Sequence, residues 1–239
     1  MIGLGTIINT AAIVVGGVLG LFFGKFLKER FRTSLMAACG VCVLFIGLGG
    51  ALEKMLTVSD GVLVAKHSAL ICVCVILGTF LGELLNIERG FERFGGWLKK
   101  KTKSESDTGF VNGFLTASLT VSIGAMAIIG AIKDGIYGDW AVLASKGMLD
   151  LILIMIMTCS LGKGCIFSAI PVLVLEGLMT LLAVVIKPIM TDLALDYVSL
   201  VGSILIFCVG LNLLREKQIR VANMLPAIVL AVIAALLPL

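Results

Sequence analysis

Residues 141–186 read AVLASKGMLDLILIMIMTCSLGKGCIFSAIPVLVLEGLMTLLAVVI, and this stretch decides the fold. It contains two apolar runs, at about 140–162 and 165–187, separated by the turn sequence Gly162-Lys163-Gly164. A helix needs about 20 residues to cross a hydrocarbon layer of roughly 30 Å, and each run is that long. The segment therefore predicts two membrane-spanning helices joined by a short turn.

The rest of the chain has the same apolar character. Of its 239 residues, 59% are hydrophobic and 14% are charged, which is too apolar for a soluble domain of this length. We expect an all-α fold, a polytopic transmembrane helical bundle in which residues 1–239 form a single domain. The apolar runs predict eight helices, at about 2–24, 34–52, 62–85, 109–132, 140–162, 165–187, 194–214 and 221–239. No basic residue precedes the first run, so we interpret it as a retained helix rather than a signal peptide.

The positions of the basic residues predict the orientation of the chain. Cytoplasmic loops of membrane proteins are enriched in Lys and Arg. Of the 19 basic residues, 14 follow the first, third, fifth and seventh predicted helices: Lys25, Lys28, Arg30, Arg32, Arg89, Arg93, Lys99, Lys100, Lys101, Lys103, Lys163, Arg215, Lys217 and Arg220. The alternation predicts an even number of helices with both termini outside, although a re-entrant pair also fits. Because orientation explains the net charge of +4, we expect no nucleic-acid partner.

The longest connection, residues 86–108, carries apolar side chains at helical spacing among basic ones. These apolar residues are Ile87, Phe91, Phe94, Trp97 and Leu98. The pattern predicts an amphipathic helix on the surface of the cytoplasmic leaflet. An ordinary solvated loop is the alternative.

Two segments of the chain resemble each other. Residues 62–82 align without gaps with residues 142–162 and share Lys66 with Lys146 and Gly82 with Gly162. The match indicates that the helices within 34–85 are repeated within 109–162 in the same orientation, as in many transporters. Chance similarity between apolar sequences is the alternative interpretation.

Charged side chains at the middle of predicted spans are the main functional candidates. Asp150 and Glu176 both lie there, and an intramembrane charge costs at least about 2.5–3.5 kcal/mol unless a partner or water compensates. Lys146 precedes Asp150 by four residues, so the two side chains share one helical face and can pair. We interpret these residues as a substrate-binding or proton-coupling site in which a carboxyl group changes protonation. A buried ion pair that only fixes helix packing is the alternative.

Several uncharged polar residues extend this candidate site. Asn9 interrupts the first span, and the fourth span carries Asn112, Ser118 and Ser122. Gly124 and Gly130 weaken the fourth span, so we expect part of it to unwind around a ligand. Hydroxyl groups bonded to helix carbonyls in ordinary packing are the alternative. We also expect Pro171 to kink the sixth span one turn before Glu176.

Glycines at four-residue spacing predict flat packing surfaces. They are Gly16, Gly20 and Gly24 in the first span and Gly78 and Gly82 in the third. Such a surface fits a neighbouring helix or a second subunit, so a homodimer agrees with the sequence.

Other classes of site lack support in the sequence. The seven cysteines lie within or beside apolar runs and the chain has one histidine, so we expect neither a metal site nor a cofactor. The motifs GxxxxGK[ST], GxSxG and HExxH are missing, so we expect no enzymatic activity and no transport driven by nucleotide hydrolysis. The lipid bilayer and a small polar solute or ion are the expected partners.

Three stretches resemble a known family. They are GLGTIINTAAIVVGGVLG at 3–20, KFLKERF at 25–31 and SIGAMAIIGAIKDGIYGDWAVLASKGMLD at 122–150. Together they resemble the domain of unknown function 554 family of bacterial membrane proteins, over essentially the whole chain. The resemblance implies a polytopic helical fold in the bacterial inner membrane and assigns no site residue.

Three functions are compatible with the sequence. The first is a secondary transporter or facilitator of a small polar solute, with Asp150, Lys146 and Glu176 near the middle of the bilayer. The second is a passive channel, which needs a continuous polar lining. The third is a membrane partner that carries no solute and uses Phe91 and Trp97 to dock on another protein.

Overall fold

A computed structural model describes residues 1–59, 61–123, 125–215 and 219–237. The chain runs through helices and one hairpin in this order: α1 (Leu4–Gly24), α2 (Glu29–Met55), β1 (Leu56–Ser59), β2 (Val62–Ala65), α3 (Ser68–Leu85), α4 (Ile87–Lys101), α5 (Phe110–Ser122), α6 (Ala125–Tyr137), α7 (Ala141–Leu161), the 3-10 helix η1 (Lys163–Ser168), α8 (Ala169–Leu181), α9 (Ala183–Ile186), α10 (Asp192–Leu214), the 3-10 helix η2 (Val221–Met224) and α11 (Pro226–Leu236).

Most of these helices are long and apolar enough to cross a membrane. Six spans meet that condition in the described part of the chain: α1, α2, α3, α7, η1 with α8, and α10. The pair α5 and α6 adds a seventh if it is counted as one bent span, and Val221–Leu236 is a shorter apolar helix. The predicted all-α polytopic bundle is therefore confirmed, and the predicted number of eight helices is approximate.

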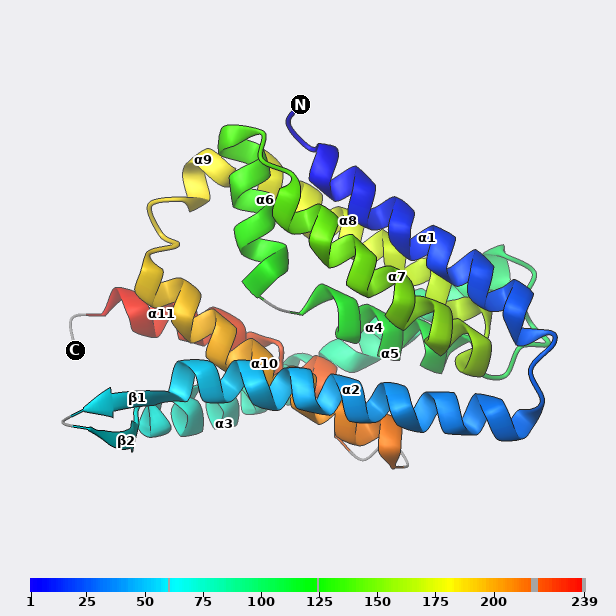
Figure 1. The fold of residues 1–239 in the computed structure, drawn as a ribbon, viewed down its shortest axis with the longest axis horizontal. Coiled ribbons are helices and arrows are strands. Elements are labelled where there is room, and N and C mark those ends of the chain that lie inside the picture. The colour runs from blue at the N-terminus through cyan, green and yellow to red at the C-terminus, as the bar shows by residue number, and fades with distance from the viewer. Residues whose placement is uncertain (60, 124, 216–218, 238–239) are drawn as a thin grey trace.

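The helices form two groups (Figure 1). In one group α1 lies along α7, with α8 and α6 beside them; in the other α2 lies along α10, and α3 packs against α11. The α5 helix contacts both groups, through η1, α7 and α8 on one side and α10 on the other. Residues between α5 and its neighbours are therefore placed at the centre of the bundle.

The glycines allow the paired helices to approach closely. A Cβ atom on Gly16 or Gly20 would overlap the backbone of α7, at the carbonyl groups of Leu151 and Met155. One on Gly24 would lie 3.2 Å from the Cα atom of Cys159. In α3, a Cβ atom on Gly78 or Gly82 would overlap the backbone of Ala227 or Asn223. All five glycines thus face neighbouring helices of the same chain.

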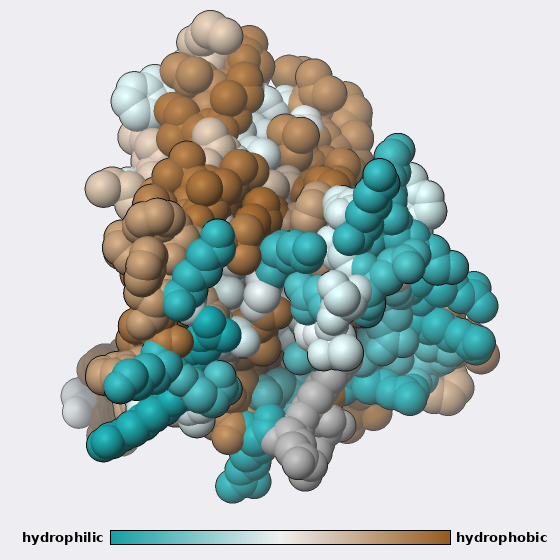
Figure 2. Space-filling model, turned by 90° about the vertical axis from the view of Figure 1, so that its right-hand side faces the viewer, coloured by the Kyte–Doolittle hydropathy of each residue, from teal (hydrophilic) through white to brown (hydrophobic). Residues whose placement is uncertain are grey.

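Hydrophilic residues gather at one end of the molecule. Figure 2 looks onto the end that carries the turn from α1 to α2 and shows hydrophilic side chains there, below an apolar flank. The connections that follow α1, α3, α7 and α10 lie at this end, in agreement with the alternation of basic residues along the sequence. Which side of the membrane this end faces remains a prediction.

A β-hairpin corrects the predicted start of the third span. The sequence predicted a helix from residue 62, but residues 62–65 form β2, which pairs with β1 in antiparallel register, Leu56 opposite Ala65 and Ser59 opposite Val62. β-branched residues favour strands, and Gly61 adopts a positive φ of 76° in the turn. The helix α3 therefore begins at Ser68.

The predicted sixth span, 165–187, corresponds to the apolar span Lys163–Leu181, but it is not one continuous α-helix. It is divided into η1, α8 and the short α9. Pro171 lies in the first turn of α8, where its missing N–H has no helical partner to lose, rather than in the middle of a kinked helix.

The fourth predicted span is broken. The α5 helix ends at Ser122, Ile123 has an extended conformation, and the axis of α6 differs by 62° from that of α5. Gly124 lies outside the described residues, and Gly130 lies within α6. The break leaves the last carbonyl groups of α5 without partners from a continuing helix.

The predicted amphipathic segment contains α4, whose two faces differ. Leu98 is buried against Phe110 and Phe114, whereas Trp97 is 51% exposed and stacks on Phe94. The backbone N–H of Glu88 donates to the Asn223 side chain at 2.7 Å. One face of α4 is therefore packed on the bundle, and the other presents an aromatic and basic surface.

Candidate functional site

Four polar residues from three helices meet inside the bundle. They are Asn9 of α1, Lys146 and Asp150 of α7, and Glu176 of α8, and none is more than 6% exposed. The packing of α1 along α7, with α8 against α1, brings them together. We call these residues the polar cluster.

The Lys146 ammonium group is the centre of the polar cluster. It forms an ion pair with Asp150 on the same face of α7, and it donates to the carbonyl oxygen of Val121 at 2.7 Å. Val121 belongs to the last turn of α5, where helix carbonyl groups lack partners and carry partial negative charge. The break after α5 therefore supplies an acceptor for the buried lysine.

Glu176 joins the polar cluster through Asn9 and Lys146. The Asn9 side chain donates from Nδ2 to Glu176 Oε1 at 2.7 Å, and the same oxygen lies 3.7 Å from Lys146 Nζ. The second Glu176 oxygen, Oε2, and Asn9 Oδ1 are buried and have no hydrogen-bond partner among the described residues. One turn away, the hydroxyl groups of Thr6 and Thr180 lie 3.2 Å apart and join α1 to α8 again.

The formal charges of the polar cluster do not balance. One ammonium group faces two carboxyl groups, so the cluster carries a net charge of −1 if both acids are ionised. Burying an uncompensated charge costs several kcal/mol. A proton or a cation bound at the cluster would balance this charge.

A cavity of about 280 Å³ reaches the polar cluster. It lies between α2, α5, α6, α7 and α10, and Lys146 and Asp150 are among its lining residues. Glu53, whose side chain is 69% exposed near the end of α2, also lines it. The cavity thus extends from the cluster toward the end of the molecule that carries the hairpin.

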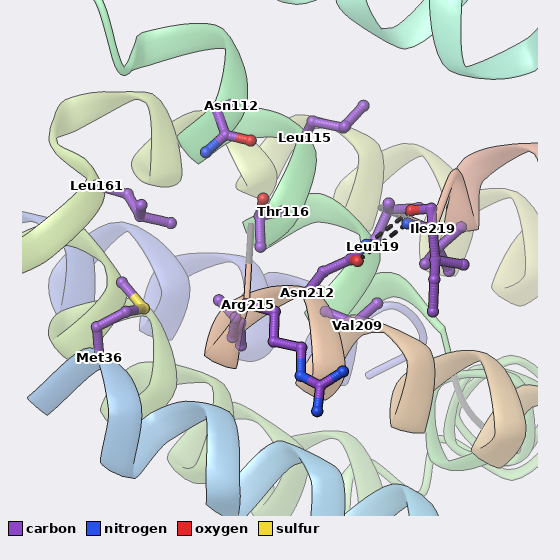
Figure 3. Close-up of a pocket in the computed structure, with 12 residues that line it drawn as sticks. Met36, Asn112, Leu115, Thr116, Leu119, Leu161, Val209, Asn212, Arg215 and Ile219 are labelled. Atoms are coloured by element: carbon purple, nitrogen blue, oxygen red, sulfur yellow. Dashed lines mark hydrogen bonds between the residues drawn. The ribbon is translucent and has the colours of Figure 1, made fainter. Parts of the chain in front are cut away.

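A second cavity, of about 210 Å³, lies toward the basic end (Figure 3). Asn112 and Thr116 of α5 line it together with Asn212 of α10 and Arg215, the residue that follows α10. The Asn212 side chain is held by two hydrogen bonds to the backbone of Ile219, at 2.7 and 3.2 Å. Both cavities touch α2, α5 and α10, so they lie along the same three helices.

Ser118 and Ser122, which the sequence analysis included in the candidate site, lie apart from the polar cluster. They line a third cavity of about 290 Å³ that is otherwise mainly apolar and includes Pro171 and Leu175. Their hydroxyl groups are buried and have no partner in the described ranges. At about 100° of rotation per residue, Ser118 lies about 120° and Ser122 about 80° around the axis of α5 from Asn112, so the serines and Asn112 point to different sides of the helix.

Asp134 was not among the candidate residues identified from the sequence. Asp134 is fully buried, and its carboxyl group accepts hydrogen bonds from the backbone N–H groups of Gly3 at 3.2 Å and Gly5 at 2.9 Å. The first N–H groups of a helix need acceptors and attract negative charge. An acidic residue at the end of an apolar run, after Lys133, was the available signal, but its partners lie 129 or more positions away.

The described residues include no group of three or more His, Cys, Asp or Glu side chains placed to bind a metal ion. The seven cysteines are free thiols.

Apolar spans around a buried charged cluster define the class of this protein as a polytopic helical membrane protein. The family described as "Protein of unknown function (DUF554)" matches residues 4–236, and the chain belongs to that family.

Two curated relatives span nearly the whole chain. The "Uncharacterized membrane protein YdfK" of Bacillus subtilis (strain 168) is 28% identical over 226 residues, covering 95% of this chain and 93% of the relative. The "Uncharacterized protein YqgA" of Escherichia coli (strain K12) is 29% identical over 234 residues, covering 95% and 94%. No solved structure matches the chain significantly.

Proposed function

We propose that this protein is a secondary transporter or facilitator that moves a small polar solute or ion across the bacterial inner membrane. The observation that carries the proposal is the cavity of about 280 Å³ inside the bundle, which Lys146 and Asp150 line. Ionisable groups within a membrane are tolerated where they face such a space, and there they mark ion and substrate pathways.

The broken helix supports the same proposal. Transporters bind substrates and coupling ions where a spanning helix is interrupted and its end points at the ligand. Here the interrupted α5 ends at the polar cluster, and its Val121 carbonyl already holds a cationic group, the Lys146 ammonium. A solute carrying an amino group would find the same acceptors.

The two cavities favour a carrier over an open channel. Asn112 and Thr116 line the cavity at the basic end, and Thr120, one turn further along α5, lines the cavity that reaches the polar cluster. The two cavities share no lining residue in the described part of the chain, and Leu205 of α10, which lines neither of them, is 0% exposed. A water-filled pore needs a continuous polar lining, whereas a carrier exposes its site to one side at a time.

The test is uptake and counterflow in proteoliposomes with labelled amino acids, small carboxylates and monovalent cations. The double variant Asp150→Asn with Glu176→Gln should lose a flux that the native chain supports. Glu105→Gln removes an exposed carboxylate outside the cluster and should retain it. Equal flux in the native chain and the double variant would contradict the proposed site, and single-channel conductance would support a channel instead.

The exposed surface of α4 supports a second candidate function, docking to a membrane partner. Trp97 and Phe94 are 51% and 39% exposed beside basic residues. Loss of cellular function in Trp97→Ala, with no flux in the purified native chain, would favour that role.

A further inference from the structure

Two orphaned oxygen atoms in the polar cluster belong to side chains that are already bonded to each other. Asn9 Nδ2 donates to Glu176 Oε1 at 2.7 Å, which leaves Asn9 Oδ1 and Glu176 Oε2 buried without partners in the described part of the chain. An ionised carboxylate and an amide oxygen are both acceptors, so neither can satisfy the other. A buried acceptor without a donor costs about 1–3 kcal/mol.

A single proton on Glu176 would give both unpaired oxygen atoms a hydrogen bond. A protonated carboxyl group has one O–H donor, and from Oε2 it can donate to Asn9 Oδ1 while Oε1 accepts from Asn9 Nδ2. The two side chains then form a carboxylic acid and amide pair with two hydrogen bonds. The same proton raises the net charge of the polar cluster from −1 to zero.

We propose that Glu176 is a proton-binding site, in which the proton is held by the carboxyl group and shared with Asn9 Oδ1. The proton comes from water and returns to it, and no other bond is made or broken. That this proton is the coupling ion of transport rests on the proposed function. That Glu176 binds a proton does not depend on it.

The charges around Glu176 agree with a proton rather than a metal ion. On α7 it faces Lys146 and Asp150, and the Lys146 ammonium group lies 3.7 Å from Oε1, where it would repel a metal cation. The α1 and α5 helices carry no titratable side chain. On α6, Asp134 is bound to the N-terminal amides of α1, and Lys133 is exposed.

The proton would also stabilise the contact between α1 and α8. When Glu176 loses its proton, Oε2 and Asn9 Oδ1 are two buried acceptors without a donor, one of them charged, and the pair of side chains is destabilised. The contact between the helices is then weakened at the depth of the site. Binding and release of a proton can therefore change how tightly α1 holds α8, as a coupled carrier requires.

The experiment is infrared spectroscopy of the full chain in liposomes across a pH titration. A protonated carboxylic acid gives a carbonyl band separate from the bands of carboxylates and amides. We expect such a band at neutral pH. It should shift when the chain is made with glutamate labelled with carbon-13 at the side-chain carboxyl, and it should not shift with labelled aspartate.

Variants assign the band to Glu176. Glu176→Gln can keep both hydrogen bonds to Asn9 as an amide pair, so it should fold and lose the band, whereas Glu105→Gln should keep it. Asn9→Leu removes the shared hydrogen bonds and should move the band to higher frequency, and circular dichroism checks that each variant is folded. No band at neutral pH, a band shifted by labelled aspartate, or a band that persists in Glu176→Gln would overturn the proton site.

Transport is scored separately from the infrared result. A glutamate band in a chain that moves no solute would refute the proposed function and leave the proton site standing. Flux that persists at a constant rate across pH, with no glutamate band, would refute the proton site and leave the proposed transport function standing.

Discussion

The Lys146 ammonium group donates a hydrogen bond of 2.7 Å to the carbonyl oxygen of Val121, the residue before the last position of α5. This contact joins two unusual features of the chain, a lysine in the middle of an apolar helix and a spanning helix that stops within the bundle. Each feature compensates the other, because the cation needs acceptors and the helix end has unpaired ones.

Removing that cation should destabilise the fold. In Lys146→Met, the buried Asp150 carboxylate loses its counter-ion, and breaking a buried pair in this way costs about 3–5 kcal/mol. The measurement is denaturant unfolding in detergent, followed by circular dichroism. Lys54→Met is the matched control, since Lys54 pairs with Asp196 at 2.9 Å where the side chains are partly exposed, and such pairs contribute about 1 kcal/mol or less. Equal losses in the two variants would show that Lys146 is not the counter-ion of the cluster.

The close contact between α1 and α7 gives a prediction about packing. Gly16→Ala places a methyl group against the Leu151 carbonyl, so the helices must separate, at a cost of about 1–3 kcal/mol. Gly49→Ala is the control, because a Cβ atom on Gly49 meets nothing within 4 Å, and Ala is the better helix former by about 1 kcal/mol. We expect thermal unfolding in detergent to occur at lower temperature for the first variant and at an equal or higher temperature for the second. An unchanged midpoint in Gly16→Ala would mean that the contact is looser than the structure indicates.

Local sequence patterns predicted those features of the fold that depend only on residues close together in the chain. Apolar runs located the spans because insertion into a membrane depends on hydrophobicity along one continuous segment. The pairing of Lys146 with Asp150 was predictable for the same reason, since a spacing of four fixes one helical face. The hairpin at 56–65 was missed because a short run of apolar β-branched residues looks the same in a strand and in a helix end.

Tertiary relationships could not be obtained in this way. Asn9 and Glu176 are 167 positions apart, and no periodicity connects them. The same holds for Asp134 and the amides of Gly3 and Gly5. The proposed repeat stays a prediction, and its aligned lysines have different surroundings, because Lys66 is exposed beside the hairpin and Lys146 is buried.

Asp134 should hold the beginning of α1 in place. Asp134→Asn removes the negative charge that accepts two backbone hydrogen bonds, and losing such a cap costs about 0.5–2 kcal/mol. Hydrogen exchange followed by mass spectrometry should show faster exchange in peptides that cover the first turn of α1. Asp139→Asn is the control, because Asp139 is exposed and accepts from the N–H of Ala141 at 3.1 Å, far from α1 in sequence. Unchanged exchange in Asp134→Asn would exclude a capping role for this carboxyl group.

The two cavities along α5 should be accessible to water from opposite sides of the membrane. In a chain whose native cysteines are replaced, Ser203→Cys lies in the cavity that reaches the polar cluster, and Thr116→Cys lies in the cavity at the basic end. A maleimide that does not cross membranes should label the first from one side of oriented vesicles and the second from the other side. Leu205→Cys is the control, because Leu205 is fully buried and lines neither cavity, so it should react with the reagent from neither side. Labelling of Ser203→Cys and Thr116→Cys from the same side would contradict two cavities that open in opposite directions, and with it the carrier arrangement, since a carrier needs a closed layer between its two entrances.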